Sequence, residues 1–274
     1  MLNEYNFEDI YIRHAIDENP HPTDYNMHIH SRCEIYFFIS GEVEYLVEGS
    51  RYPLAENNLM IMRPSESHTA RIIESRKYER FAINFPSSYF NQIDSKNLLM
   101  QPFMDRPLGQ GNLFTQKDMD MDMELVRKLF FEMMKDSSPE ERKMILNTHL
   151  GMILYMIYSA FSSSPVDKRR PQSFSEGVIS YINVHLFEEI TVPSLAEHFF
   201  LSSSQFSRIF RRDIGSSPWE YILRKRLTAA REMLKKGLSA QSACYECGFN
   251  DYSSFYRSYI KYFHEAPAVT KIKI

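Results

Sequence analysis

The chain has 274 residues, a formal net charge of −3 and a hydrophobic fraction of 43%. That is enough for one large domain or two ordinary ones with buried cores. Three cysteines cannot form a disulfide framework, and no apolar run reaches about 18 residues, so a disulfide-rich scaffold and a membrane partner are not expected. The start of the chain has neither the basic nor the apolar region of a signal peptide. We therefore expect a cytoplasmic protein.

The charge is divided unevenly along the chain. Residues 172–274 carry 13 Lys and Arg against 10 Asp and Glu, whereas residues 1–171 carry 19 against 25. A mildly basic part behind an acidic part is typical of a nucleic-acid-binding module joined to a second domain. The difference is small, so it supports this interpretation only together with the motifs.

Residues 25–85 predict short β-strands. Four segments, 34–40, 43–49, 58–64 and 79–85, are rich in β-branched and aromatic residues and are separated by Gly, Pro and Asn. Their short and fairly regular spacing predicts a small antiparallel barrel or sandwich.

Residues 117–161 have a helical pattern instead. Ser138 and Pro139, followed by two glutamates, mark a helix start, so two amphipathic helices are predicted. The hydrophobic stripe of the second helix is broad for a lone surface helix, which predicts that it pairs with a second copy of the chain. Packing against the chain's own barrel is the alternative. The stripe consists of Leu146, Leu150, Ile153, Leu154 and Ile157.

The segment 162–173 is polar, contains two prolines and a basic run, and has no periodicity. It is the best linker candidate in the chain, and we place the linker itself at 166–173.

Beyond the linker the sequence marks the ends of its helices clearly. Ser202 and Gln205 form a capping box, and Ser217 precedes Pro218 at the start of a long helix that runs to Gly237. Glycines follow three of the predicted helices, where a left-handed C-cap requires them. This part of the chain is therefore predicted to be all-helical.

Two segments, 195–212 and 242–261, share one plan: a short helix, a tight turn and a second helix. Each second helix turns short polar residues and one arginine outward, which suits a DNA major groove, and Arg211 and Arg212 could contact phosphates. A plain helical bundle with polar outer faces is the alternative. The predicted outward residues are Ser203, Ser204, Gln205, Arg208, Tyr252, Ser253, Ser254 and Arg257.

Residues 174–267 resemble the DNA-binding domain of the AraC family of transcription regulators. The matching pieces are SLAEHF, LSSSQFSRIFRRDIGSSPWEYI, RLTAAREML and GFNDYSSFYRSYIKYF. The resemblance implies that 203–212 and 251–262 are two recognition helices, and that the outward residues above occupy the family's DNA-contact positions.

The segment from His28 through His30 and Glu34 to Gly41 resembles the first motif of the cupin barrel, and residues 58–68 resemble an irregular second motif that ends at His68. In metal-binding cupins the matching residues, His28, His30, Glu34 and His68, are the ligands, and imidazole with carboxylate suits iron, manganese, nickel and zinc. Regulators that look like this chain often keep the first motif without a metal. We therefore expect no metal cofactor and assign His28, His30, Glu34, Tyr36 and His68 to a small organic ligand, with metal binding as the alternative. His28, His30 and Glu34 are expected to alternate along one strand and to point the same way.

We predict an α+β protein with four parts: a cupin-like effector-binding β-barrel (1–112), a helical dimerisation segment (113–165), the linker, and an AraC-type domain with two helix-turn-helix units (174–274). Its predicted function is ligand-responsive activation of sugar-utilisation genes, with double-stranded DNA, a carbohydrate effector, RNA polymerase and a second copy as partners. It is not expected to be an enzyme. The alternatives are a metal-dependent cupin enzyme fused to a DNA-binding domain and a ligand-independent regulator.

Overall fold

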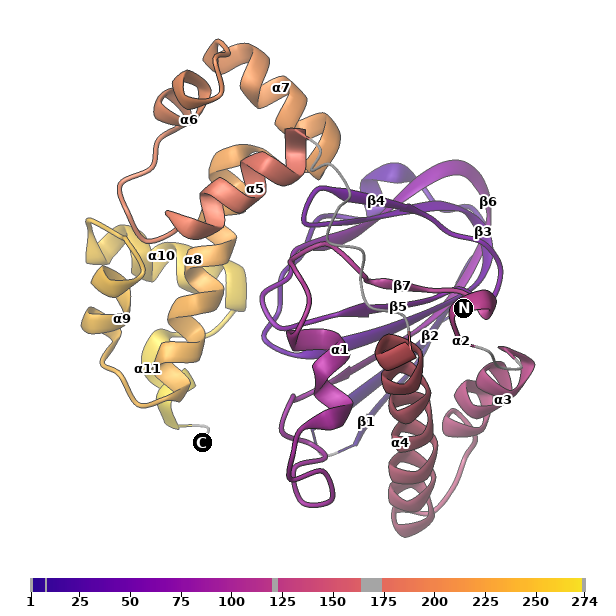
Figure 1. The fold of residues 1–274 in the computed structure, drawn as a ribbon. Helices are drawn as coiled ribbons and strands as arrows, with labels where there is room; N and C mark the ends of the chain where they lie inside the picture. Colours follow the sequence, from indigo (N-terminus) through magenta and orange to yellow (C-terminus); the bar gives the residue numbers. More distant parts are fainter. Residues whose placement is uncertain (1, 8, 120–122, 164–173, 273–274) are drawn as a thin grey trace.

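The computed structural model describes residues 2–7, 9–119, 123–163 and 174–272. An antiparallel sheet with helices on one face forms the N-terminal part, and a separate helical domain follows (Figure 1). The predicted α+β class, with an N-terminal antiparallel β domain and a C-terminal all-α domain, is confirmed. The predicted linker at 166–173 lies outside the described residues.

The described part of the sheet has seven strands in the order β1-β2-β6-β3-β5-β7, with β4 paired to β3. The sequence indicated strands only from residue 25 onward, so β1 and β2 were missed, and two predicted strands merge into the long β3. The strands are β1 (Leu2–Phe7), β2 (Ile10–Asp17), β3 (Cys33–Val47), β4 (Ser50–Pro53), β5 (Leu59–Met62), β6 (His68–Phe85) and β7 (Leu113–Phe114).

Strands β3 and β6 pair from Cys33↔Phe85 to Val47↔His68, with register shifts between Phe38 and Val43. Gly41 lies at this irregularity with φ of +133°, and an added Cβ would lie 3.3 Å from the Tyr78 Cα atom. Such bulges bend a strand and increase its twist. The paired strands therefore curve instead of forming a flat ribbon.

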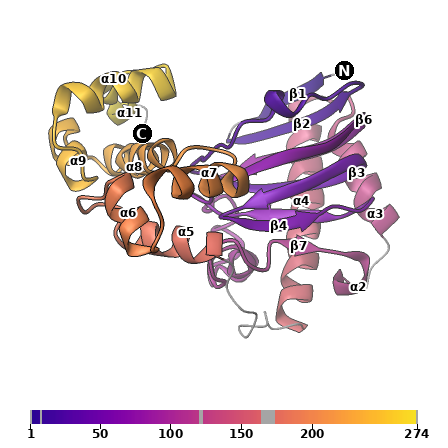
Figure 2. The same cartoon turned by 90° about the horizontal axis from the view of Figure 1, so that it is seen from above.

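The two faces of the sheet have different partners because side chains alternate along a strand. Ile35 and Phe37 of β3 belong to a large hydrophobic core that includes the helices α3 and α4, whereas Tyr36 and Phe38 belong to a second core on the other face. Figure 2 shows the helices along one face of the sheet. The helices of this region are α1 (Gln101–Met104), α2 (Gln116–Met119), α3 (Met123–Met133) and α4 (Pro139–Ser163).

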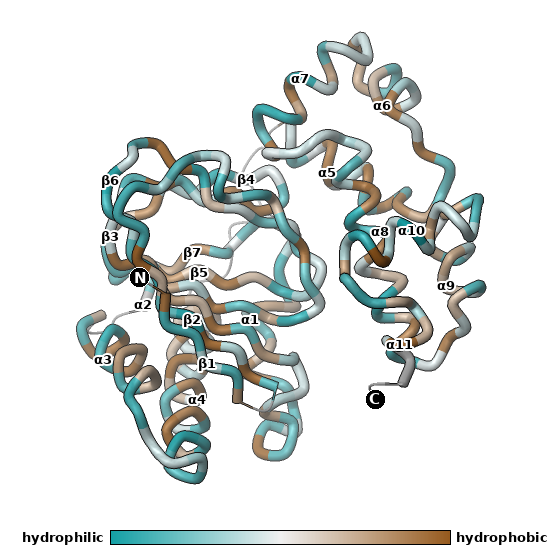
Figure 3. The backbone as a smooth tube through the Cα atoms, turned by 180° about the vertical axis from the view of Figure 1, so that it is seen from behind, coloured by the Kyte–Doolittle hydropathy of each residue, from teal (hydrophilic) through white to brown (hydrophobic). Residues whose placement is uncertain are grey.

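Helix α4 begins at Pro139 as predicted, and among the described residues it is the one helix long and apolar enough to cross a membrane. Its stripe Leu146, Leu150, Ile153, Leu154 and Ile157 is buried in the core it shares with the sheet. Figure 3 shows hydrophobic residues of α4 where it runs beside the strands. The prediction that this stripe pairs with a second copy is therefore wrong, because the chain's own sheet covers it.

The helical domain has the predicted helix starts. The side chains of Thr191, Ser202, Ser217, Ser239 and Asp251 each accept a backbone N–H hydrogen bond at a helix N-terminus. The glycines after three of these helices, at 215, 237 and 248, have φ between +78° and +96°. The helices are α5 (Phe174–Val184), α6 (Val192–His198), α7 (Ser203–Ile214), α8 (Pro218–Lys235), α9 (Ala240–Glu246), α10 (Tyr252–Phe263) and α11 (Pro267–Ile272).

Candidate DNA interface and effector site

Helices α6 and α7 form the first helix-turn-helix unit. Ser203, Ser204, Gln205 and Arg208 are all exposed on α7, while Phe206 on its opposite face is fully buried. The Gln205 Oε1 atom accepts a hydrogen bond from the Ser202 backbone N–H at 3.2 Å, which completes the capping box. This leaves the amide NH2 group of Gln205, a hydrogen-bond donor, for a base edge or phosphate.

Helices α9 and α10 form the second unit. Ser253, Ser254 and Arg257 are exposed, whereas Tyr252 is half-buried and its ring centroid lies 5.9 Å from that of Phe255. Part of the Tyr252 ring therefore packs inside the unit. Helix α8, with 18 residues, connects the two units and spans about 27 Å at 1.5 Å per residue.

The two arginines predicted to contact phosphates differ in their surroundings. Arg211 and Arg212 are both exposed, but the Arg212 guanidinium lies 2.8 Å from Asp213 Oδ1 and 3.2 Å from Asp213 Oδ2. This ion pair raises the pKa of Arg212 and lowers that of Asp213, whose burial alone would raise it. Arg211 is therefore the less engaged of the two cations.

The proposed effector residues come from three short segments. Glu34 and Tyr36 lie on β3, and His68 is the first residue of β6. His28 and His30 precede β3, and the backbone of His28 pairs with that of His68 in an isolated bridge. The expectation that His28, His30 and Glu34 alternate along one strand is therefore wrong, because the chain bends at residues 31–32 before β3 begins.

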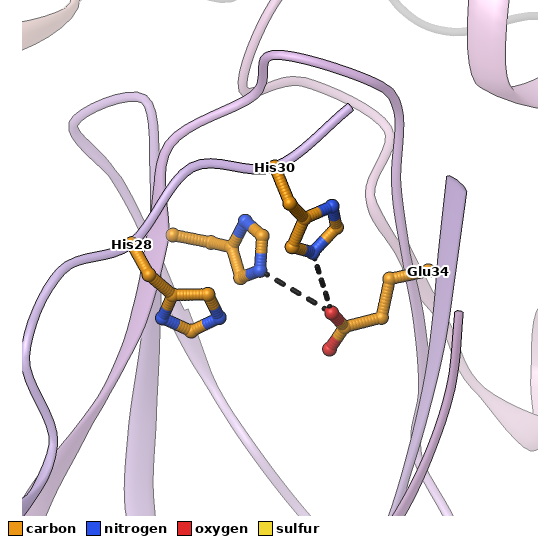
Figure 4. Close-up of side chains that lie close together, drawn as sticks. His28, His30 and Glu34 are labelled. Atoms are coloured by element: carbon orange, nitrogen blue, oxygen red, sulfur yellow. Dashed lines mark hydrogen bonds and ion pairs between the residues drawn. The ribbon is translucent and has the colours of Figure 1, made fainter. Parts of the chain in front are cut away.

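These segments nevertheless bring four side chains together. The potential ligand atoms of His28, His30, Glu34 and His68 all lie within 4.8 Å of one another. Figure 4 shows the labelled His28, His30 and Glu34 around one point. The His30 Nε2 atom lies 2.8 Å from Glu34 Oε2, and His68 Nε2 lies 3.4 Å from the same oxygen. Glu34 and His68 are buried, His30 is half-buried and His28 is exposed.

The electrostatics of this cluster favour charge on its buried members. Burial alone would raise the pKa of Glu34, but the neighbouring His30 and His68 bring it well below its usual range. Burial alone would lower the pKa of His68, but Glu34 raises it. The two opposed shifts show that Glu34 and His68 stabilise each other's charged forms.

A cavity of about 310 Å³ opens beside the cluster, and Tyr36 lines it as predicted from the sequence. Half of the lining residues that sequence reasoning missed lie on β6, where Tyr78, Arg80, Ala82 and Asn84 follow at intervals of two. The Arg80 guanidinium lies 4.1 Å from the Tyr78 ring centroid, and the Tyr36 and Tyr78 hydroxyls contact each other. The alternation of residue types at intervals of two in 78–84 was visible in the sequence. It does not tell which face of the strand lines the cavity.

A cavity-bearing sheet domain joined to two helix-turn-helix units defines a DNA-binding transcription regulator. Family models agree with this class: residues 195–271 match a helix-turn-helix domain, and residues 14–141 match an AraC-like ligand binding domain.

Two curated relatives span most of the chain. The uncharacterized HTH-type transcriptional regulator YobQ of Bacillus subtilis (strain 168) is 26% identical over 86% of this chain and 85% of its own length. The HTH-type transcriptional activator RhaS of Escherichia coli (strain SE11) is 20% identical over 92% of this chain and 90% of its own. The solved structure of ToxT from Vibrio cholerae covers 97% of this chain and 98% of its own, with 10% identity and a TM-score of 0.41. The chain belongs to the AraC family of DNA-binding transcriptional regulators.

Proposed function

We propose that this regulator activates transcription in response to a small polar effector bound in the cavity of its sheet domain. The observation that carries the proposal is the combination, in one chain, of two exposed recognition helices and a cavity into which His28, His30, Glu34 and Arg80 converge. A concave site with a few converging polar groups is the usual form of a small-molecule site. That RhaS is named as an activator supports activation as the direction of control.

A carbohydrate is our first candidate for the effector. The cavity offers hydrogen-bonding groups of both kinds, with Arg80 and the Asn84 amide as donors and Glu34 as an acceptor, beside the rings of Tyr45 and Tyr78. Hydroxyl groups both donate and accept, so a polyhydroxylated molecule satisfies such a lining. In this proposal the domain senses the molecule and does not transform it.

A homodimer and RNA polymerase complete the proposed set of partners. Because the predicted stripe of α4 is covered by the sheet, the dimer contact is assigned instead to the outer face of the same helix. Met144, Met152 and Tyr155 lie on that face and are 61%, 44% and 62% exposed. Residues at these spacings lie on one side of a helix, so they form an apolar strip, which the exposed Thr148 interrupts.

The DNA side of the proposal is tested by footprinting the full chain on sequences that it selects from a random pool. We expect protection of two successive major grooves about 34 Å apart. Arg208→Ala should cost about 1–3 kcal/mol and relax the preference at one base pair, whereas Arg211→Ala should weaken all sequences alike and flatten the salt dependence. Arg76→Ala, which changes an exposed arginine of the sheet domain, is the control. Protection of a single groove, or equal effects of all three variants, would contradict the proposal.

A further inference from the structure

The two recognition helices can be matched residue by residue. Helix α7 follows the N-cap residue Ser202, and helix α10 follows the N-cap residue Asp251. In both helices the fourth residue is a fully buried phenylalanine, Phe206 or Phe255, and the sixth is an exposed arginine. Because the buried residue and the arginine match, the same positions of both helices face outward.

The helices differ at the first and fifth residues. In α7 these residues are Ser203 and Ser207, whereas in α10 they are Tyr252 and Tyr256. The ring centroids of the two tyrosines lie 6.1 Å apart, with an angle of 35° between the ring planes. The second helix therefore has a pair of aromatic rings where the first has two small hydroxyl side chains.

The two tyrosines are held differently. Tyr252 is half-buried and packs against the hydrophobic core of the second unit, where its ring centroid lies 5.9 Å from that of Phe255. Tyr256 is 38% exposed, although its neighbour Phe255 is fully buried. Packing therefore fixes the Tyr252 ring, whereas much of the Tyr256 ring remains in contact with water.

The aromatic pair lines an open hollow of about 320 Å³ on α10, together with Ser253 and Arg257. Residues four apart are neighbours on a helix surface, so Tyr252 with Tyr256 and Ser253 with Arg257 form two adjacent rows. The hollow therefore lies on the same side of α10 as Arg257, the side chain expected to contact a guanine.

The chemistry of the major groove indicates what fits this hollow. Each thymine exposes an apolar 5-methyl group there, and apolar side-chain surface is the usual partner of that group. A tyrosine ring supplies such a surface and keeps its hydroxyl group at the tip, where it can contact phosphate or water. Cytosine has only a hydrogen atom at the same ring position, so it would leave the hollow unfilled.

We propose that the hollow between Tyr252 and Tyr256 receives the 5-methyl group of a thymine, next to the base that Arg257 contacts. The inference rests on the DNA binding by α10 proposed above, and it adds a base preference to that helix. Helix α7 has serines at the two matching positions, so the first unit offers a methyl group no comparable ring surface. The thymine requirement should therefore be confined to the groove that α10 occupies.

The experiment measures binding of the full chain to a sequence that it selects from a random pool. The groove occupied by α10 is identified as the one whose protection Arg257→Ala weakens. Each thymine of that groove is then replaced in turn by deoxyuridine, which keeps the base pair and lacks only the methyl group. From the usual gain for burying one such group, the critical replacement should weaken binding about fourfold.

Variants of α10 connect this loss to the ring. Tyr256→Ser, which gives α10 the matching residue of α7, should bind the thymine and deoxyuridine sequences equally. Tyr256→Phe keeps the ring and should keep the fourfold difference. Tyr245→Ser removes an exposed tyrosine of α9 in the same unit, so it is the matched control and should also keep the difference.

A second selection from the random pool reads the same preference without modified bases. Sequences selected by the wild type should share a thymine at one position of the groove that α10 occupies. Sequences selected by Tyr256→Ser should lose the preference at that position and keep those of the other groove.

No loss at any thymine of that groove, or a fourfold loss that persists in Tyr256→Ser, overturns the proposal. Loss of the difference in Tyr256→Phe would assign the effect to the hydroxyl group, and an equal loss in the groove of the first unit would assign it to the DNA, so either result also overturns it. Two protected grooves without a methyl effect would leave the proposed function standing. A chain that protects no DNA would contradict both.

Discussion

Two buried carboxylates in the sheet domain have opposite surroundings. Glu66 accepts hydrogen bonds from both Nη atoms of Arg106, at 2.8 and 2.7 Å, and neither side chain of this ion pair is exposed. It also accepts from the backbone N–H groups of Gly109 and Arg63 and from the Asn112 amide. Every neighbour of Glu66 is a donor. Its hydrogen bonding is complete within the protein, so this cluster needs no further group.

Glu34 is also buried, but of the nitrogens that face it only the Asn84 amide is a fixed donor. Its neighbours His30 and His68 donate their Nδ1 protons to the backbone, and His68 Nε2 reaches Glu34 Oε2 only at 3.4 Å. The buried carboxylates of Glu66 and Glu34 therefore have different roles. A complete cluster stabilises the fold, whereas an incomplete one is prepared for a group from outside.

The largest effect that would sharpen this comparison is expected from Glu66→Gln. The substitution leaves the fully buried Arg106 guanidinium without its charge partner, and breaking a buried ion pair in this way costs about 3–5 kcal/mol. Urea unfolding followed by circular dichroism measures the change, with Glu42→Gln on the sheet surface as the control. A loss below about 1 kcal/mol would remove the distinction between the two clusters.

The contribution of the Glu66 carboxyl should also be visible in the pH dependence of the unfolding free energy. Its contacts with Arg106 and with backbone N–H groups outweigh burial and lower the pKa of Glu66 from 4.5 to about 2. A carboxyl with a lowered pKa stabilises the fold fully above pH 4.5, and this contribution is lost as the pH falls toward 2. We expect the gap in unfolding free energy between wild type and Glu66→Gln to shrink by about 3 kcal/mol over this range. A gap that stays constant would contradict the assignment.

The smallest effect is expected at the other carboxylate. Glu34→Gln should lower the free energy of unfolding by less than Glu66→Gln does, because the imidazoles beside Glu34 can lose their charge, whereas the Arg106 guanidinium cannot. The same urea experiment measures it. A loss comparable to that of Glu66→Gln would place Glu34 in the structural cluster and argue against a ligand site.

The helical domain was predictable in detail because its signals are local. A capping serine such as Ser202 and a C-terminal glycine such as Gly215 act within one turn of their helix, so the sequence alone locates the ends. The exposed faces of α7 and α10 follow from the same periodicity. The half-buried position of Tyr252 and contacts between side chains, such as the ion pair of Arg212 with Asp213, escaped prediction.

The sheet domain was less predictable because its contacts are distant in sequence. Asn84 lies opposite Glu34 only through the register of β3 with β6, and no local pattern reveals that register. The apolar stripe of α4 was visible, but not whether a sheet or a second copy covers it. The four cluster residues were found through a motif resemblance, although the predicted strand geometry behind them was wrong.

The central claim is that the cluster of His28, His30, Glu34 and His68 receives a group from outside. A crystal structure of the full chain with an effector that changes its DNA footprint tests it most directly. The account predicts that polar atoms of the effector lie within hydrogen-bond distance of Glu34 and of at least one of the three Nε2 atoms. An effector bound elsewhere, with ordinary hydrogen bonds closing the cluster, would contradict it.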